Sequence, residues 1–331
     1  MRRFEHRLHA TLRVALAIWP AGALPGQAQR LELPARPAGA PGGAAIAREI
    51  RTLELTDREE RIRAEFLRGN VPSWLRQLVP VERTRRIGGA AHRVTFWVAP
   101  DYLAVGSDDD YFLAPLTPQS AQRIADSVGA SLPTPLMVDA IWSAARVRLA
   151  PSPIPPSPEM TTVLVFEDHD GRVRTQRALE SAPAGSLVAG HKKDVVLTPR
   201  LDTLRGKVAI YGWHRADGTP IQPLYTGHTD RWVDYSHGIR LVSRGILVDG
   251  VRHDIIDVLR DPALAGLLSD DGLMRDPRYP HFSSDTSRVG GPPASAVRSR
   301  SSTNRFARHA GGRWPALPRR RVREVRDPAL S

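Results

Sequence analysis

Residues 208–242 read VAIYGWHRADGTPIQPLYTGHTDRWVDYSHGIRLV and decide the fold of the second half of this chain. The runs Val208–Tyr211 and Ile239–Val242 are short, rich in β-branched residues and separated by glycine and proline, which is typical of strands in an antiparallel sheet. The same pattern predicts strands at Val195–Leu197, Ile246–Val248, Thr161–Phe166 and Val173–Arg177. The second half is therefore predicted to be predominantly antiparallel β.

The first half of the chain alternates helical and extended patterns. A helix is predicted from Thr56, which forms a capping-box pattern with Glu59, and further helices are predicted to open at Thr117-Pro118 and at Pro135. Short aromatic and β-branched runs predict a meander of strands at 93–98, 102–105 and 111–114. The predicted fold class is α+β, with a helical and meander N-terminal half and a predominantly antiparallel β second half.

Composition divides the chain into five segments. We expect a signal peptide at 1–28, a flexible tether at 29–55, an α+β region at 56–150, a β-rich region with a His/Asp site at 159–275, and a disordered basic tail at 286–331. A proline-rich run separates the two middle regions, and this leaves open whether they form two domains or one.

The N-terminus has the layout of a secretory signal peptide. Arg2, Arg3 and Arg7 precede the apolar run Leu12–Leu24, and the small residue Ala28 stands before a possible cleavage point. We therefore expect an exported protein, periplasmic or extracellular. No later run approaches the roughly 18 apolar residues that a membrane-spanning helix needs, so we expect no transmembrane segment.

The net charge of +12 is carried by the two ends of the chain. Residues 1–28 carry +3 and residues 286–331 carry +9, which leaves the part between them neutral. A fold that binds nucleic acid would carry its positive charge on the folded surface, so we expect no specific nucleic-acid partner. The basic tail is instead predicted to bind anionic polymers of the cell envelope.

Four histidines fall between positions 191 and 237 of a chain that has no cysteine, so imidazole, carboxylate and hydroxyl groups must supply any metal binding or acid–base chemistry. One model places a divalent metal, zinc or a similar ion, on His214 and His228 with Asp194 or Asp234 as a third ligand. His191 is a further candidate ligand just before a predicted strand. In this model His237 acts as the general base.

A second model makes Ser236 a nucleophile. Neighbouring residues on an extended segment point to opposite sides, so the base would be His214 or His228 and not His237.

The run Ser236-His237-Gly238-Ile239-Arg240-Leu241 resembles the Ser-His-Gly-Cys-Ile/Val-Arg-Leu/Met signature of the L,D-transpeptidases, exported β-rich enzymes that cross-link peptidoglycan. His214 resembles their upstream histidine. The nucleophilic cysteine, expected between Gly238 and Ile239, is missing, so thiol catalysis is excluded. The resemblance implies that Ser236, His237 and Arg240 belong to a catalytic site or to its inactive descendant. The wider stretch Tyr211–Val242 also resembles a family of exported bacterial proteins.

Three functions remain open on this evidence. The leading hypothesis is an exported metal-assisted hydrolase that acts on a cell-envelope peptide or glycan. The second is a non-catalytic module that binds the same envelope polymers, with aromatic residues such as Tyr225 and Trp232 lining its pocket. The third is a catalytically inactive relative of the L,D-transpeptidases.

Overall fold

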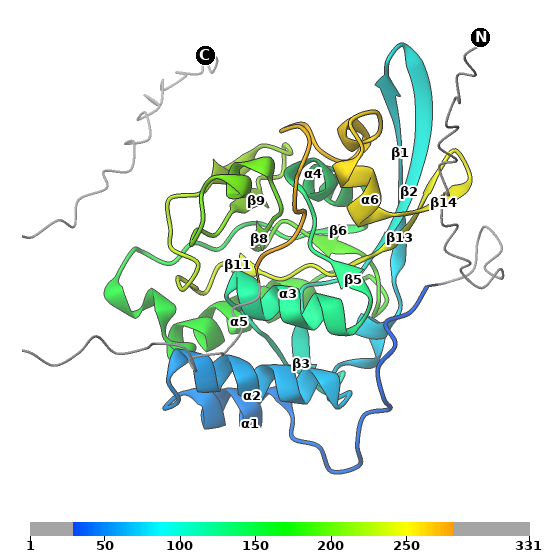
Figure 1. Cartoon of the computed structure of the whole chain (residues 1–331). Helices are drawn as coiled ribbons and strands as arrows, with labels where there is room; N and C mark the ends of the chain where they lie inside the picture. Colours follow the sequence, from blue (N-terminus) through cyan, green and yellow to red (C-terminus); the bar gives the residue numbers. More distant parts are fainter. Residues whose placement is uncertain (1–28, 281–331) are drawn as a thin grey trace, which may run out of the picture. The chain divides into compact units, whose positions relative to one another are not determined.

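The larger sheet is built around β2 (Ala90–Val98), in a computed structural model that describes residues 29–280. Along one edge, β2 pairs with β1 (Val79–Ile87) in a long antiparallel hairpin that turns at Gly88-Gly89, where both glycines have positive φ (Figure 1). Along the other edge, β2 pairs with β13 (Gly245–Val248) and β12 (Val242–Ser243). The sheet continues to β14 (Val251–Asp254) beside β13 and to β5 (Ala130–Ser131) beside β12. Strands from both halves of the chain therefore share one sheet.

The smaller sheet holds the histidine-rich segment. Its order is β10 (Pro220–Tyr225), β9 (Ile210–His214), β8 (Lys193–Val195) and β11 (His237–Gly238). All pairs are antiparallel except β8 with β11, which run parallel with Lys193 opposite His237. Two short pairs complete the strands: β3 (Ala104–Gly106) with β4 (Tyr111–Leu113), and β6 (Val147–Arg148) with β7 (Val188–Ala189).

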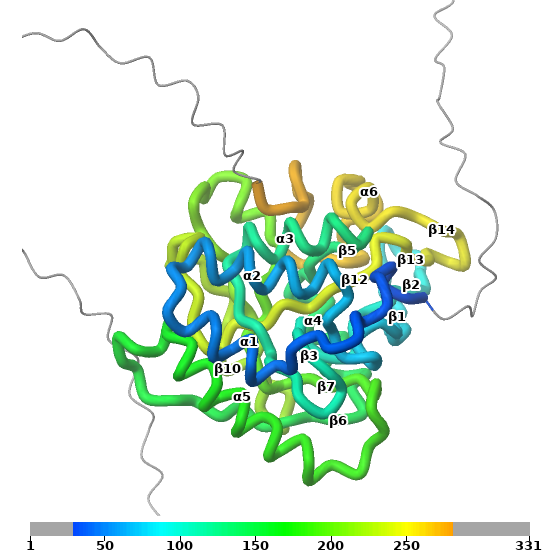
Figure 2. The backbone as a smooth tube through the Cα atoms, turned by 90° about the horizontal axis from the view of Figure 1, so that it is seen from below, coloured from blue at the N-terminus to red at the C-terminus, as the bar shows by residue number. Residues whose placement is uncertain are grey.

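Six helices accompany the sheets in residues 29–280, and this combination confirms the α+β class. They are α1 (Gly43–Ile50), α2 (Leu55–Leu67), α3 (Pro118–Ser127), α4 (Pro135–Ala144), α5 (Val163–Ala178) and α6 (Ile255–Arg260). The 3-10 turns are η1 (Ser73–Arg76), η2 (Pro158–Thr161), η3 (Pro199–Asp202) and η4 (Ala265–Leu267). Both views place α1 and α2 next to one another (Figures 1 and 2). None of the helices in residues 29–280 is long and apolar enough to cross a bilayer.

The predicted strands at 161–166 and 173–177 are wrong, because one helix, α5, covers both. Its buried residues Val163, Phe166, His169, Asp170 and Val173 recur at helical spacing, so one face of α5 lies against the core. The β-branched residues and Gly171 favoured a strand-turn-strand interpretation from local propensity, which packing of this face overrides.

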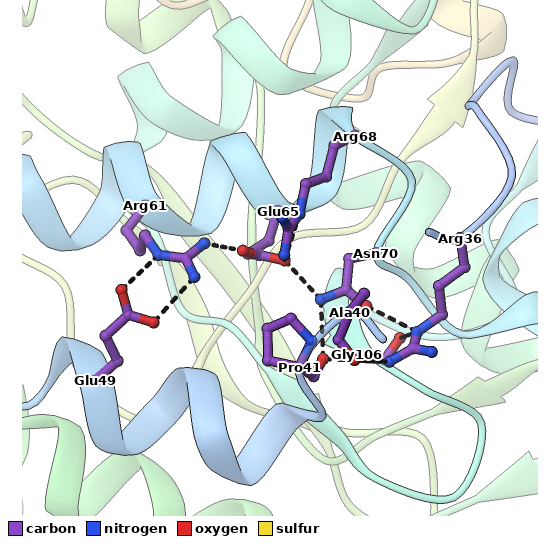
Figure 3. A network of polar contacts seen from close by, with 9 residues as sticks. All are labelled: Arg36, Ala40, Pro41, Glu49, Arg61, Glu65, Arg68, Asn70 and Gly106. Carbon is purple, nitrogen blue, oxygen red and sulfur yellow. Dashed lines mark hydrogen bonds and ion pairs between the residues drawn. The ribbon is translucent and has the colours of Figure 1, made fainter. Parts of the chain in front are cut away.

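The predicted tether at 29–55 is also wrong, because this segment contains α1 and contributes to the core through Ile46 and Ile50. Arg36 donates to the side chain of Asn70 (2.8 Å) and to the carbonyl of Ala40 (2.6 Å), as Figure 3 shows. Asn70 in turn donates to Glu65 (2.6 Å). The alanine, proline and glycine of this segment therefore permit close packing and do not produce a flexible linker. The predicted signal peptide at 1–28 and basic tail at 286–331 lie outside the described residues.

The capping role predicted for Glu59 belongs to a different helix. Helix α2 has no side-chain cap, whereas the Glu59 carboxylate accepts from the backbone N–H and hydroxyl of Thr117 and from the hydroxyl of Ser120, each at 2.6 Å. A carboxylate at this position satisfies the free N-terminal groups of α3 and interacts favourably with its dipole.

Candidate functional site

Polar side chains gather in the interior where the smaller sheet meets α5 and the loop before β3. They are largely buried, and several are charged: Asp101, His169, Asp170, His191, Lys192, Lys193, Asp194, His214, Asp234, Ser236, His237 and Arg240. Burying charged groups carries a large desolvation cost unless they are paired and hydrogen-bonded. Such a cluster with unusual proton affinities is therefore a candidate functional site.

At the end of β9, the buried His214 of this cluster pairs with a carboxylate that is about half exposed, Asp139 of α4. His214 Nε2 lies 2.9 Å from Asp139 Oδ1 on α4, and the hydroxyl of Tyr211 donates to the same oxygen at 2.9 Å. The His214 ring stacks on Trp142 with the ring centres 5.6 Å apart. Nδ1 has no hydrogen-bond partner in residues 29–280. The carboxylate thus orients an imidazole whose second nitrogen is not engaged by another side chain of the described residues.

A second carboxyl group, Asp194 of β8, lies near the same histidine. A Cβ atom on Gly212 would lie 3.5 Å from His214 Cε1 and 3.6 Å from Asp194 Oδ2, so both groups border the space in front of this glycine. Tyr102 donates its hydroxyl to Asp194 Oδ2 at 2.8 Å. Burial raises the pKa of Asp194 to about 6, because the charged carboxylate is poorly solvated there.

Arg240, which the signature resemblance placed in a catalytic role, lies fully buried behind Tyr102. Its guanidinium donates to the carbonyls of Ala99 (2.9 Å) and Val188 (2.7 Å) and lies 4.1 Å from the centre of the Tyr102 ring. Arg240 therefore joins the ends of two strands and supports Tyr102 by a cation–π contact.

Ser236 and His237 share Asp234 but do not form a nucleophile–base pair. Asp234 Oδ1 accepts from the backbone N–H and the hydroxyl of Ser236, and His237 Nε2 lies 3.9 Å from Asp234 Oδ2. Burial would raise the pKa of Asp234, but His237 and Lys193 hold it below its usual value. Burial also lowers the pKa of His237 to about 4. The prediction that these adjacent residues cannot serve one another agrees with this geometry.

Trp213 is held in a strained backbone conformation beside this group. Its φ of 58° lies in the left-handed region, which is rare for a bulky residue and costs free energy. The strain lets the indole lie under the Lys193 ammonium, 5.1 Å from the ring centre, while the chain continues to His214. Burial lowers the pKa of Lys193. A strained residue between two polar groups is a further mark of a functional region.

Behind the sheet, His191 and Lys192 connect the cluster to α5 and to the loop before β3. His191 Nε2 lies 3.1 Å from Asp101 Oδ1, off the direction that a hydrogen bond requires. Lys192 donates to the carbonyl of Tyr235 at 2.6 Å. Burial lowers the pKa of Lys192 to about 8 and raises that of Asp170, on α5, to about 7.

His228, the other predicted metal ligand, lies in a ladder of aromatic rings. It stacks on Trp232 at 5.0 Å between ring centres and meets the edge of Tyr225 at 5.1 Å. Trp232 donates its indole N–H to Asp234 Oδ2 at 3.2 Å. This ladder is partly exposed and lies at a different place from the pair of His214 and Asp139.

The predicted metal ligands do not converge. Within residues 29–280 no three His, Asp or Glu side chains are arranged to hold a metal ion. Of the five predicted ligands, His214 bonds Asp139, Asp194 bonds Tyr102, His191 faces Asp101, and Asp234 bonds Ser236. Lys192 and Lys193 also act on the charge of Asp234. These side chains therefore have other partners in the described residues and do not form one common donor set.

Elemental analysis tests the metal prediction directly. We expect the full-length protein, dialysed after incubation with zinc, manganese and iron salts, to retain none of them in stoichiometric amount, because a cation at Asp234 would meet two ammonium groups. Near-stoichiometric metal that is lost on substituting both His214 and His228 by alanine would contradict this expectation and restore the metal-assisted reaction.

The partners that orient the predicted residues are not visible in the sequence. Asp139 lies in the helix predicted to open at Pro135, Tyr102 in a predicted strand of the meander, and Asp101 in the break before that strand. Asp139 is 75 positions from His214 in sequence, and Tyr102 is 92 positions from Asp194. No local spacing connects residues so far apart. Searches of protein-family models, of curated proteins and of solved structures found no match for the chain.

Proposed function

We propose that the protein is an exported hydrolase of a cell-envelope peptide or glycan, in which Asp139, His214 and Asp194 perform acid–base catalysis. The observation that carries this proposal is the pair formed by His214 and Asp139 at 2.9 Å, beside a second carboxyl group whose pKa is raised to about 6. When two carboxyl groups lie in different environments, one can be protonated and act as an acid while the other is ionised at the same pH.

In the proposed reaction, His214 Nδ1 takes a proton from a water molecule, and the water oxygen attacks the electrophilic carbon of the substrate. Asp139 holds the ring orientation through Nε2 and stabilises the imidazolium that forms. Asp194, in its protonated form, gives its proton to the leaving nitrogen or oxygen. Gly212 supports this arrangement, because any side chain there would fill the space between the two groups.

The aromatic surroundings favour a polymer substrate. Trp142 lies against His214, and Arg148 covers the Trp142 ring at 4.6 Å. Partly exposed rings beside polar groups are common in sites for sugars and for peptides with flat faces. Because the predicted signal peptide would direct the protein out of the cytoplasm, we place this substrate in the cell envelope.

The pH dependence of the rate tests the role of Asp194. Because its pKa is raised to about 6, the carboxyl group is protonated below that pH and loses its proton above it. We expect kcat on solubilised cell-wall polymer to fall about tenfold per unit as pH rises beyond about 6. In Asp194→Asn the rate should be low and this alkaline fall absent. A wild-type rate that stays constant from about pH 5 to about pH 8 would exclude Asp194 as the acid.

The ring ladder of Tyr225, His228 and Trp232 favours one alternative, a non-catalytic envelope-binding module. The binding module predicts the opposite result when the protein is incubated with cell-wall polymer. Cell-wall polymer would bind without release of products, and binding would survive substitution of His214.

A further inference from the structure

A cleft of about 330 Å³ is lined by Asp101 of the cluster but not by His214, and it has no part in the proposed reaction. Its walls come from η1, the loop before β4, the last turn of α5 and β7. The volume is at the lower end of the range for pockets that hold small ligands, roughly 300 Å³. Trp74 and Tyr111 form an aromatic wall, in edge-to-face contact with their ring centres 5.3 Å apart.

The charge of the cleft is predominantly negative. Four carboxylates line it, from Asp101, Asp108, Asp109 and Glu180, against the single guanidinium of Arg177. Arg177 donates to the carbonyls of Ala182 (3.4 Å) and Pro183 (3.2 Å), which hold it against its own loop. The carbonyl end of α5, a helix of 16 residues, also lies at this cleft and adds negative potential.

Asp101 is the feature that points to a ligand. It is only 6% exposed, and both of its contacts, from the Tyr102 backbone N–H (2.7 Å) and from His191, go to Oδ1. Oδ2 has no hydrogen-bond partner within residues 29–280, and the residue lines the cleft. Burial would raise the pKa of Asp101, but His191 and Arg240 keep it below its usual value, so the carboxylate stays charged. Although the residue is mostly buried, Oδ2 is not enclosed by protein atoms, so it is accessible from the cleft and can accept a hydrogen bond from a ligand there.

We propose that this cleft binds the primary ammonium group of an organic ligand, with Asp101 Oδ2 as its main acceptor and Trp74 and Tyr111 against the adjoining carbon chain. An ammonium group brings three donors. Asp108 already accepts from the backbone N–H and hydroxyl of Ser73, so within residues 29–280 the acceptors left for a ligand are Asp101 Oδ2 and the carboxylates of Asp109 and Glu180. The aromatic wall favours an organic cation over a metal ion, because rings contact both the charge and the methylene groups beside it. A diamino-acid side chain of an envelope peptide and an amino sugar of an envelope glycan both carry this group.

The proposal does not depend on hydrolysis, so direct binding to the full-length protein tests it. We would titrate Nα-acetyl-lysine methylamide by calorimetry, beside the norleucine analogue, which has the same chain length without the charge. We expect the lysine compound to bind and the norleucine compound to bind at least about tenfold more weakly. A methyl glycoside of glucosamine, tested in parallel, distinguishes an amino sugar from a diamino acid as the source of the ammonium group.

Two variants complete the experiment. Asp101→Asn keeps the shape and removes the charge, and should weaken binding of the lysine compound at least about tenfold. Asp168→Asn is the control, because Asp168 is an exposed carboxylate on α5, paired with Arg172 and outside the cleft. The affinity of this variant should match that of the wild type. If Asp101→Asn does not fold, the double variant Asp109→Asn/Glu180→Gln replaces it, because it changes only exposed residues. This variant should also bind the lysine compound more weakly than the wild type, so that half-saturation requires a higher ligand concentration. Equal affinity for the lysine and norleucine compounds, or no binding of any ammonium compound, would overturn the proposal.

Discussion

Substituting His214 by glutamine is expected to lower kcat for hydrolysis of cell-wall polymer about 10³-fold, within the range that a general base contributes. Glutamine retains polarity at the end of β9 but cannot take up a proton. The measurement is the release of soluble fragments at saturating substrate, with circular dichroism to establish that the variant is folded.

His228→Gln is the matched control for this experiment. Like His214, His228 is stacked on a tryptophan, but it is only partly buried and forms no carboxylate pair like that of His214 with Asp139. It should retain most of the wild-type kcat. Equal loss of activity in the two variants would contradict the proposed base and favour the two-histidine metal model. Full activity in His214→Gln would remove His214 from the mechanism.

Substituting Glu65 by alanine is expected to lower the free energy of unfolding by about 3 kcal/mol, the size typical of breaking a buried ion pair from one side. Glu65 is completely buried and accepts hydrogen bonds from Arg61, Arg68 and Asn70 (Figure 3). Its removal leaves the Asn70 amide with one acceptor fewer, takes the carboxylate away from Arg68, and leaves Arg61 paired with Glu49 alone. Urea denaturation followed by tryptophan fluorescence measures the change.

Glu60→Ala provides the comparison on the same helix. Glu60 is about half exposed and pairs with Arg63 three residues later, so its loss should cost less than about 1 kcal/mol. The difference between the two variants measures how strongly the Glu65 network attaches the segment before α1 to the rest of the protein. A loss no larger for Glu65→Ala than for Glu60→Ala would show that the buried network contributes little to stability.

Local signals in the sequence were reliable where a single residue restricts the backbone. Helices α3 and α4 begin at Pro118 and Pro135, as their Thr-Pro pairs predict, since proline at the first helical position already has the required φ. The runs in the meander and in 208–211 also lie in or next to strands. These signals were enough to predict the α+β class.

The candidate site was only partly predictable, because its residue types were visible and their partners were not. Four histidines in a chain without cysteine mark the region, yet spacing alone grouped His214 with His228. In the structure His214 belongs with Asp139, and His228 with Trp232. Which carboxylate reaches which imidazole depends on how α4 lies against β9, and no local pattern encodes that arrangement.

By itself, the sequence determined the fold class, the helix starts at Pro118 and Pro135, and the neighbourhood of the site, because short-range backbone preferences and composition act within a few residues. Only the tertiary structure decided that 163–178 is one helix, that 43–50 is part of the core, and that Asp139, His214 and Asp194 meet. The physical reason is that burial and desolvation depend on neighbours far away in sequence. A segment with mixed local preference adopts the conformation that buries its apolar face, and a carboxyl group acquires its proton affinity from the interior that the fold builds around it.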